Sequence, residues 1–325
     1  MSDSRIVTVT GAGGFIGRAL VAHFESAGRA CRAVVRQDDT ERRATPNCRT
    51  VRDLAVASDA EIDGLVAGAR AVVHLAGRAH VLDETDPEPA AAFVSANVAA
   101  TARLARAAVR AGVERFVFAS TIKVNGEASV PGRPFVPGDA PDPRDLYART
   151  KRDAERELAA ICEGMPMAVI SLRLPLVYGP GVKGNFAALL DEVARARPLP
   201  LGAIRNRRSV LFSGNLVEAI DAALDAPAPP TGVHFVTDAE SVSVPALVTA
   251  MGKALDVPVR LKAVPVRLLL FAGQVTGRRA LIERLVGTLE ADPASFVDAT
   301  GWRPRHALEE GLASTARWWR MRHSI

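Results

Sequence analysis

A tyrosine and a lysine four residues apart could together move a proton. Tyr147 and Lys151 lie near the start of a predicted helix over 144–163, and this spacing puts both side chains on one helical face. An ammonium beside a phenol favours the phenolate and lowers the pKa of the phenol toward neutral pH. The same spacing also arises by chance as a surface pair. Its meaning therefore depends on the elements that position it.

A glycine-rich turn near the N-terminus could hold a pyrophosphate. The turn follows a β-branched run over 6–10 and precedes apolar residues at helical spacing over 15–27. In a strand–turn–helix unit, glycines spaced by three permit a tight turn and close approach of a dinucleotide, and the helix N-terminus supplies free N–H groups. A turn without a ligand is the alternative. We predict a dinucleotide site whose residues are Gly11, Gly13, Gly14, Phe15, Ile16 and Gly17.

The end of the second predicted strand should select between the two nicotinamide dinucleotides. This strand, 33–35, is followed by Arg36, and the acidic residues Asp38 and Asp39 come later. An arginine at this place accommodates a ribose 2′-phosphate, whereas an acidic residue binds the 2′-hydroxyl. Arg36 favours NADP(H), and NAD(H) stays open if Asp38 occupies the binding position. Asp53 and Leu54, after the third strand, are expected at the adenine edge.

Strands and helices alternate through the first half of the chain. Apolar strands are predicted at 6–10, 33–35, 71–75, 115–119 and 167–172, with helices at 15–27, 90–111 and 144–163 between them. This order predicts an α/β fold, a Rossmann-type doubly wound parallel sheet. Proline and glycine cluster after residue 175 and indicate a smaller, partly interleaved α/β substrate domain. The expected division assigns 1–172 and about 208–228 to the dinucleotide, and 173–207 and 229–325 to the substrate.

Composition narrows the classes of partner. The 325 residues are 48% hydrophobic and 24% charged, as in ordinary folded α/β proteins. The net charge of +5 comes mostly from arginines, which could suggest a nucleic acid, but they are scattered rather than clustered and would equally suit a diphosphate. Three cysteines without a CxxC pair favour a reducing cytoplasm. The apolar run 268–272 is too short to span a membrane and predicts a packed helix, and no cluster typical of a metal site is visible.

Several motifs jointly resemble one family. The sequence is similar to the extended short-chain dehydrogenase/reductase family, in its nucleotide-sugar epimerase, dehydratase and 4-keto-reductase branch, and looks like bacterial enzymes of surface-polysaccharide sugars. The resemblance covers essentially the whole chain. The motifs that carry it are Gly11-x-x-Gly14-x-x-Gly17, His74-Leu75-Ala76-Gly77, Asn97-Val98-x-x-Thr101, Phe118-Ala119-Ser120-Thr121, Tyr147-x-x-x-Lys151, Arg173-x-x-x-Val177-Tyr178-Gly179-Pro180-Gly181 and Gly301-Trp302-x-Pro304.

The resemblance assigns roles to these positions. Tyr147 would be the acid/base, and Lys151 would orient the nicotinamide ribose and stabilise the phenolate. Thr121, with Ser120 beside it, would offer a hydroxyl to the reacting sugar oxygen. The resemblance also implies a UDP-sugar substrate. Further cofactor contacts are expected from Leu75, Ala76, Gly77, Asn97 and Pro175, and substrate contacts from Arg78, Thr121, Asn185 and Arg208.

Two reactions at the sugar C4 stay open. A 4-epimerase oxidises C4 and returns the hydride to the other face, whereas a 4-keto reductase performs only the return. Arg36, and Leu176 where many epimerases carry asparagine, favour slightly a reductase of a 4-keto-6-deoxy-hexosamine. A non-catalytic dinucleotide sensor or assembly factor is the alternative of another class, and it typically lacks the tyrosine or the lysine. A homodimer through the helices over 90–111 and 144–163 is also expected.

Overall fold

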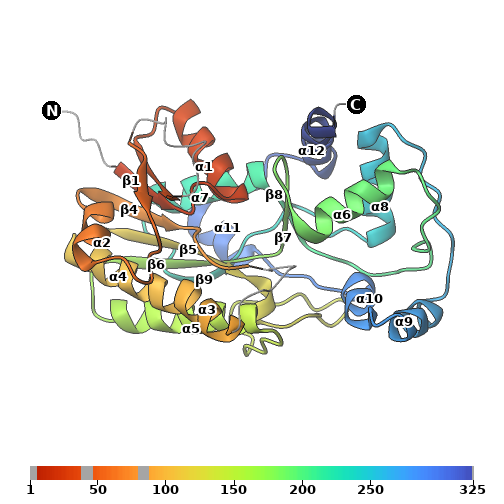
Figure 1. The fold of residues 1–325 in the computed structure, drawn as a ribbon, viewed down its shortest axis with the longest axis horizontal. Coiled ribbons are helices and arrows are strands. Elements are labelled where there is room, and N and C mark those ends of the chain that lie inside the picture. The colour runs from red at the N-terminus through yellow and green to blue at the C-terminus, as the bar shows by residue number, and fades with distance from the viewer. Residues whose placement is uncertain (1–5, 38–46, 80–87, 324–325) are drawn as a thin grey trace.

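A seven-stranded parallel sheet forms the centre of the larger lobe (Figure 1). The computed structural model describes residues 6–37, 47–79 and 88–323. The strand order is β3-β2-β1-β4-β5-β6-β9, and every pairing in this sheet is parallel. The order confirms the predicted doubly wound Rossmann topology. The strands are β1 (Ile6–Thr10), β2 (Cys31–Arg36), β3 (Arg49–Val51), β4 (Ala69–His74), β5 (Arg115–Thr121), β6 (Ala168–Leu174) and β9 (Gly232–Phe235).

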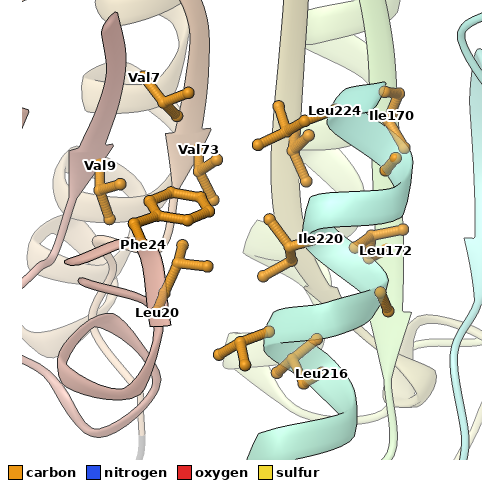
Figure 2. Packing of buried hydrophobic residues seen from close by; sticks show 14 of the residues in the cluster. Val7, Val9, Leu20, Phe24, Val73, Ile170, Leu172, Leu216, Ile220 and Leu224 are labelled. Atoms are coloured by element: carbon orange, nitrogen blue, oxygen red, sulfur yellow. The ribbon is translucent and has the colours of Figure 1, made fainter. Parts of the chain in front are cut away.

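Helices cover both faces of this sheet because its strands are apolar on both sides. On one face, α1 (Phe15–Ser26) and α7 (Ser213–Asp225) pack against the strands. Figure 2 shows Phe24 of α1 beside Val73 of β4, and Ile220 of α7 in the same hydrophobic cluster as Leu172 of β6. On the other face lie α2 (Asp59–Val66), α4 (Ala100–Arg110) and α5 (Leu146–Cys162). Two separate hydrophobic cores therefore hold the sheet rigid between them.

A smaller lobe has its own core. Its two-stranded parallel sheet pairs β7 (Leu176–Tyr178) with β8 (Val210–Phe212). Around this sheet lie α6 (Gly184–Ala194), α8 (Val244–Leu255), α9 (Val266–Val275), α10 (Arg279–Val286) and α12 (Leu308–His323). None of the helices in the described ranges is both long and apolar enough to cross a bilayer.

The interleaving of the two lobes differs in detail from the expected division of the chain. That division places residues 229–325 on the substrate side, yet β9 pairs with β6 at the edge of the large sheet. Phe296 of α11 (Ala294–Thr300) packs into the core beneath that sheet as well. β8, expected with the dinucleotide part, instead pairs with β7 in the smaller lobe. Short strands carry too little pattern to indicate which sheet they join.

The predicted helix over 90–111 is interrupted. The structure has α3 (Pro89–Val94), a five-residue π-helical segment η2 (Ser95–Ala99) and then α4. Such wide turns often occur at functional sites. Here the turn carries the buried Asn97, whose side chain serves the site described below.

Candidate functional site

The glycine-rich turn between β1 and α1, with the first turn of α1, leaves no room for a side chain at Gly11 or Gly17. Gly11 has a φ of +70°, and a Cβ there would lie 2.6 Å from the backbone nitrogen of Ala76. A Cβ on Gly17 would lie 2.2 Å from the carbonyl oxygen of Gly11. The exposed Gly14 is the N-cap of α1, whose first N–H groups lack intrahelical partners. These features fit a pyrophosphate at the start of α1. The other predicted residues of this turn are the partly exposed Gly13, Phe15 and Ile16.

The turn lies where the strand order reverses. β1 has β2 on one side and β4 on the other, and ligands of doubly wound sheets bind in the crevice at this point. The segment after β4 contains the predicted residues Leu75, Ala76 and Gly77, and it runs beside the turn. The backbone N–H of Leu75 donates to the carbonyl of Thr10 at 3.1 Å. Two predicted cofactor segments are therefore adjacent in space.

A buried histidine fixes the end of β4. The two ring nitrogens of His74 lie 2.6 Å from Oγ1 of Thr10 and 2.9 Å from Oγ1 of Thr101. The hydroxyl of Thr101 donates to the carbonyl of Asn97, so it accepts from Nε2 of His74 and the ring carries its proton there. Burial, and secondly the charge of Lys151, lowers the pKa of His74 to about 3. A neutral imidazole thus bridges β1, β4 and the start of α4.

Asn97 connects the segment after β4 to α5. Its Oδ1 accepts from the backbone nitrogen of Arg78 at 2.7 Å, and its Nδ2 donates to the carbonyl of Arg78 at 2.9 Å and to Oγ1 of Thr150 at 3.0 Å. The hydroxyl of Thr150 in turn donates to the carbonyl of Tyr147. Its amide thus makes three hydrogen bonds to two residues, in a position that orients the loop and the helix. The expected contact of Asn97 with the cofactor stays a prediction.

The helix that carries the tyrosine and lysine begins with a side-chain cap. Oδ1 of Asp145 accepts from the backbone nitrogen of Ala148 at 2.7 Å, and Oδ2 of the same carboxylate pairs with Nζ of Lys123 at 2.7 Å. The cap fixes where α5 starts and therefore which direction Tyr147 takes. Tyr147 is half-buried, one helical turn before Lys151.

Lys151 is buried against the end of β5. Its Nζ donates to the carbonyl of Ala119 at 2.8 Å and lies 4.5 Å from the centre of the Phe118 ring and 5.9 Å from that of Tyr147. A Cβ on Gly77 would lie 3.3 Å from the same Nζ. The ammonium therefore faces the glycine of the segment after β4. A Cβ would also lie 2.9 Å from Oδ1 of Asn97, so glycine lets the loop pass close to both side chains.

The pKa values differ from the expectation for this pair. Burial, with a further contribution from Asp145, raises the pKa of Tyr147 to about 12, whereas the lysine was expected to lower it. Burial also lowers the pKa of Lys151 to about 8, although Glu155 opposes this shift. The physical reason is that desolvation of both groups exceeds their mutual attraction at this separation. Additional positive charge beside the phenol is required to bring its pKa toward neutral pH.

The two hydroxyls at the end of β5 have different surroundings. Thr121 caps the short 3₁₀ helix η3 (Ile122–Val124), where its Oγ1 accepts from the backbone nitrogen of Lys123 at 3.3 Å. That bond leaves the hydroxyl proton available to a substrate oxygen. The hydroxyl of Ser120 donates instead to Oε1 of Glu155 at 2.5 Å in the interior. Ser120, predicted beside Thr121 as catalytic, is therefore committed to a structural bond.

A buried ion pair fixes the segment around Thr121. The guanidinium of Arg173 on β6 makes two bonds to Glu155 on α5, of 3.0 and 2.6 Å, and a third to Oδ1 of Asn125 at 2.8 Å. Both charged side chains are below a tenth exposed. Ser120 and Asn125 lie on either side of Thr121, so the pair holds both ends of the segment that presents it.

Sequence reasoning missed Glu155 as part of the site. The available signal was the spacing itself, because Tyr147, Lys151 and Glu155 follow one another at intervals of four on the same helical face. Asp145 was also missed, although an aspartate directly before a helix is a typical N-cap.

The predicted adenosine-side residues lie at the ends of β2 and β3. Arg36 is the exposed last residue of β2, while Asp38 and Asp39 lie outside the described residues. Asp53 is exposed, and its Oδ1 accepts from the backbone nitrogen of Ala55 at 2.8 Å. Leu54 is buried beneath the sheet. Pro175 is buried between β6 and β7, at the passage from the large sheet to the smaller lobe.

The predicted substrate residues are distributed over both lobes. Arg78 is half-buried in the segment after β4 and so lies near the other site residues. Asn185 is exposed in the first turn of α6. Nη1 of Arg208 donates to the carbonyls of Arg284 and Gly287, at 2.6 and 3.0 Å, and so ties β8 to the end of α10. Asn185 and Arg208 thus belong to the smaller lobe, whereas the tyrosine–lysine pair lies on the large one.

Comparison with known proteins agrees with this arrangement. The model of the NAD dependent epimerase/dehydratase family matches residues 7–236. A UDP-glucose 4-epimerase of Vibrio cholerae is 36% identical over 316 residues, which cover 95% of this chain and 94% of that protein. Among solved structures, MoeE5 in complex with UDP-glucose and NAD is 27% identical, with a TM-score of 0.74 over 98% of this chain and 99% of that one. The UDP-glucuronic acid 4-epimerase of Bacillus cereus in complex with NAD shares the fold at 18% identity, with a TM-score of 0.77 over 97% of this chain and 99% of that one.

Proposed function

Because the chain belongs to the NAD dependent epimerase/dehydratase family, enzymes of the extended short-chain dehydrogenase/reductase type, we propose that it is a 4-epimerase of a UDP-linked sugar. The observation that carries the proposal is the placement of Tyr147 and Lys151 on α5, beside Gly77 at the strand-order reversal of the sheet. A phenol on this helix suits proton transfer at the crevice where this fold holds a dinucleotide.

The site fits NAD, because the bare backbone at Gly11 and Gly17 and the N-terminus of α1 form a pyrophosphate cradle. When bound, NAD supplies the acceptor and donor of the hydride. Lys151 would hold the ribose on the nicotinamide side, where its ammonium faces Gly77. We assign the adenosine side to Arg36 and Asp53, at the far end of the same crevice.

Tyr147 is the proposed acid/base at the sugar 4-hydroxyl. Its phenolate accepts the hydroxyl proton during oxidation at C4 and the phenol returns that proton after the keto sugar has turned over. Thr121 donates to the same oxygen and orients it. Since burial raises the pKa of Tyr147 to about 12, positive charge from Lys151 and from the oxidised nicotinamide must favour the phenolate.

Similarity to a UDP-glucose 4-epimerase over nearly the whole chain moves our preference from the reductase to the epimerase. A 4-keto reductase using NADPH stays the second candidate, since Arg36 ends β2 in an exposed position suited to a 2′-phosphate. The two reactions differ in cofactor balance. An epimerase regenerates its NAD in every cycle, whereas a reductase consumes one NADPH per product.

The deciding experiment is incubation with UDP-glucose, UDP-N-acetylglucosamine and a UDP-4-keto-6-deoxy sugar, followed by sugar NMR and absorbance of the reduced cofactor. Interconversion of 4-epimers without net change in absorbance supports the epimerase. Stoichiometric consumption of NADPH supports the reductase. Tight dinucleotide binding with no turnover of any sugar would indicate a non-catalytic sensor and refute both.

Tyr147→Phe tests the assigned acid/base. We expect turnover to fall by about 10²–10⁴-fold, because one proton-transfer group is lost, with NAD affinity nearly unchanged. Tyr178→Phe is the matched control, since that second tyrosine is buried in the smaller lobe with its hydroxyl on Asp238. Equal turnover in Tyr147→Phe and the wild-type protein would remove the basis of the mechanism.

We also propose a cytoplasmic homodimer that serves surface-polysaccharide precursors. Free thiols at Cys31, Cys48 and Cys162 suit a reducing compartment. The helices α4 and α5 pack side by side and offer the expected dimer face. Light scattering of the purified protein measures the number of subunits, and a monomeric mass would contradict this arrangement.

A further inference from the structure

The helix α9 carries an apolar face that nothing in the described structure covers. Leu268, Phe271 and Val275 are 58%, 66% and 71% exposed. They are spaced by three and four residues, so they form one stripe along the helix. The buried residues Leu269 and Gly273 lie on the opposite side, where the helix packs against α10. A helix that is apolar on both sides normally has a second apolar environment.

The segment that carries this stripe is rich in positive charge. Residues 260–286 contain six basic residues and one acidic residue, Glu283, a net charge of +5 that equals the formal charge of the entire chain. The basic residues are Arg260, Lys262, Arg267, Arg278, Arg279 and Arg284. Arg279 pairs with Glu283, whereas Arg267 and Arg278 are exposed beside the stripe. This segment therefore carries a higher density of positive charge than the chain as a whole.

The α9–α10 hairpin lies at the outer corner of the smaller lobe, away from the large sheet (Figure 1). Leu281 of α10 is 45% exposed and adds to the apolar surface. The hairpin is held closed at Gly273, where a Cβ would come 2.9 Å from the Ile282 side chain, and Arg278 donates its N–H to the carbonyl of Gly273 at 2.7 Å. A rigid apolar corner that projects outward is shaped to enter a surface layer.

We propose that the α9–α10 hairpin docks on an anionic phospholipid surface. Leu268, Phe271 and Val275 enter the boundary between headgroups and acyl chains, and the surrounding arginines contact the lipid phosphates. Amphipathic helices with an apolar stripe flanked by basic residues bind membranes in this way, without spanning them. A second copy of the chain is a poorer occupant, because a twofold contact would bring two patches of +5 together. The proposal does not depend on the proposed sugar chemistry.

Vesicle flotation of the full chain tests the proposal. We expect binding to vesicles of phosphatidylglycerol mixed with phosphatidylcholine, and none to pure phosphatidylcholine. Binding should weaken as salt is raised to about 0.5 M, where the Debye length is only a few ångströms. No flotation with the anionic vesicles at low salt would overturn the proposal.

Two sets of variants separate the apolar and the electrostatic contributions. Leu268→Ser with Phe271→Ser should reduce binding about tenfold or more, because two partly exposed apolar side chains are lost from the lipid contact. Arg267→Glu with Arg278→Glu should also abolish the preference for anionic lipid. Met321→Ser is the matched control, since this exposed methionine lies elsewhere, on α12, and its change should leave binding intact.

Light scattering of the same variants tests whether a second copy of the chain covers the stripe. If Leu268→Ser with Phe271→Ser converts a dimer into a monomer, a second copy covers the stripe and the lipid proposal is wrong. If the variants float as well as the Met321→Ser control, the stripe is not the docking surface. Retained NAD binding shows that each variant is folded, because the cofactor cradle lies in the other lobe.

Discussion

Glu155→Gln removes a buried negative charge that balances the guanidinium of Arg173. Glu155 and Arg173 are 7% and 5% exposed, and the carboxylate accepts two bonds from the guanidinium and one from Ser120. The glutamine keeps the shape but leaves Arg173 a buried cation without its counter-charge. Breaking a buried pair in this way costs about 3–5 kcal/mol. We expect the lower end of this range, since the amide oxygen still accepts one bond.

This loss should appear directly in unfolding experiments. An unfolding entropy of roughly 2 cal/mol/K per residue converts about 3 kcal/mol into a Tm decrease of about 4–5 °C for cooperative unfolding of the chain. Urea unfolding followed by tryptophan fluorescence and a thermal scan measure both quantities. Glu114→Gln is the matched control, because Glu114 pairs with Arg70 at 3.2 Å on the surface and is 57% exposed. Its loss should cost at most about 1 kcal/mol.

The reasoning is refuted if Glu155→Gln is no more destabilising than Glu114→Gln. A second readout tests the positioning role. Ser120 and Asn125 hold the segment on both sides of Thr121, so kcat should fall in Glu155→Gln at temperatures where the variant is folded, with KM for NAD little changed. An unchanged kcat would show that Glu155 contributes only to the stability of the fold.

Three further changes test the cofactor turn, the lysine and the dinucleotide preference. Gly17→Ala should abolish NAD binding in a titration, because its Cβ would lie 2.2 Å from the carbonyl oxygen of Gly11; normal affinity would show that the turn can relax. The pKa of Lys151 is lowered from 10.5 to about 8, so the folded state binds fewer protons than the unfolded state between these values. The unfolding free energy of the wild-type protein should therefore rise with pH in this window relative to Lys151→Met, by up to about 3 kcal/mol, and parallel urea midpoints across the window would contradict it. Arg36→Asp should shift the ratio of NADPH to NADH affinities toward NADH, and an unchanged ratio would show that residues outside the strand end decide the preference.

The local pattern of the chain was sufficient for the core of the sheet. β-branched runs, helical apolar spacing and the glycine turn each reflect interactions between residues close in sequence, and the strands at 6–10 and 115–121 and the helix at 146–162 were predicted near their observed bounds. The tyrosine–lysine pair was found for the same reason, since one helical turn separates its members. The resemblance to a family supplied the expected roles, which no spacing could provide.

Contacts between distant segments required the tertiary structure. The amide of Asn97 bonds to Arg78 and Thr150, 19 and 53 residues away, and Ser120 reaches Glu155 across 35 residues. These pairings give Asn97 and Ser120 structural partners that the sequence did not indicate. The direction of the Tyr147 pKa shift likewise followed from desolvation, which depends on everything packed around the phenol.

The sequence by itself thus determined the order of strands and helices, the glycine-rich turn and the helical register of the tyrosine–lysine pair, because backbone sterics and periodicity act over a few residues. Only the tertiary structure decided which polar side chains bond to other protein groups in the interior and which apolar face of α9 is left uncovered. Burial is a property of the whole fold. The apolar run over 268–272 forms the predicted helix and packs through Leu269, but only the structure shows that Leu268 and Phe271 stay exposed.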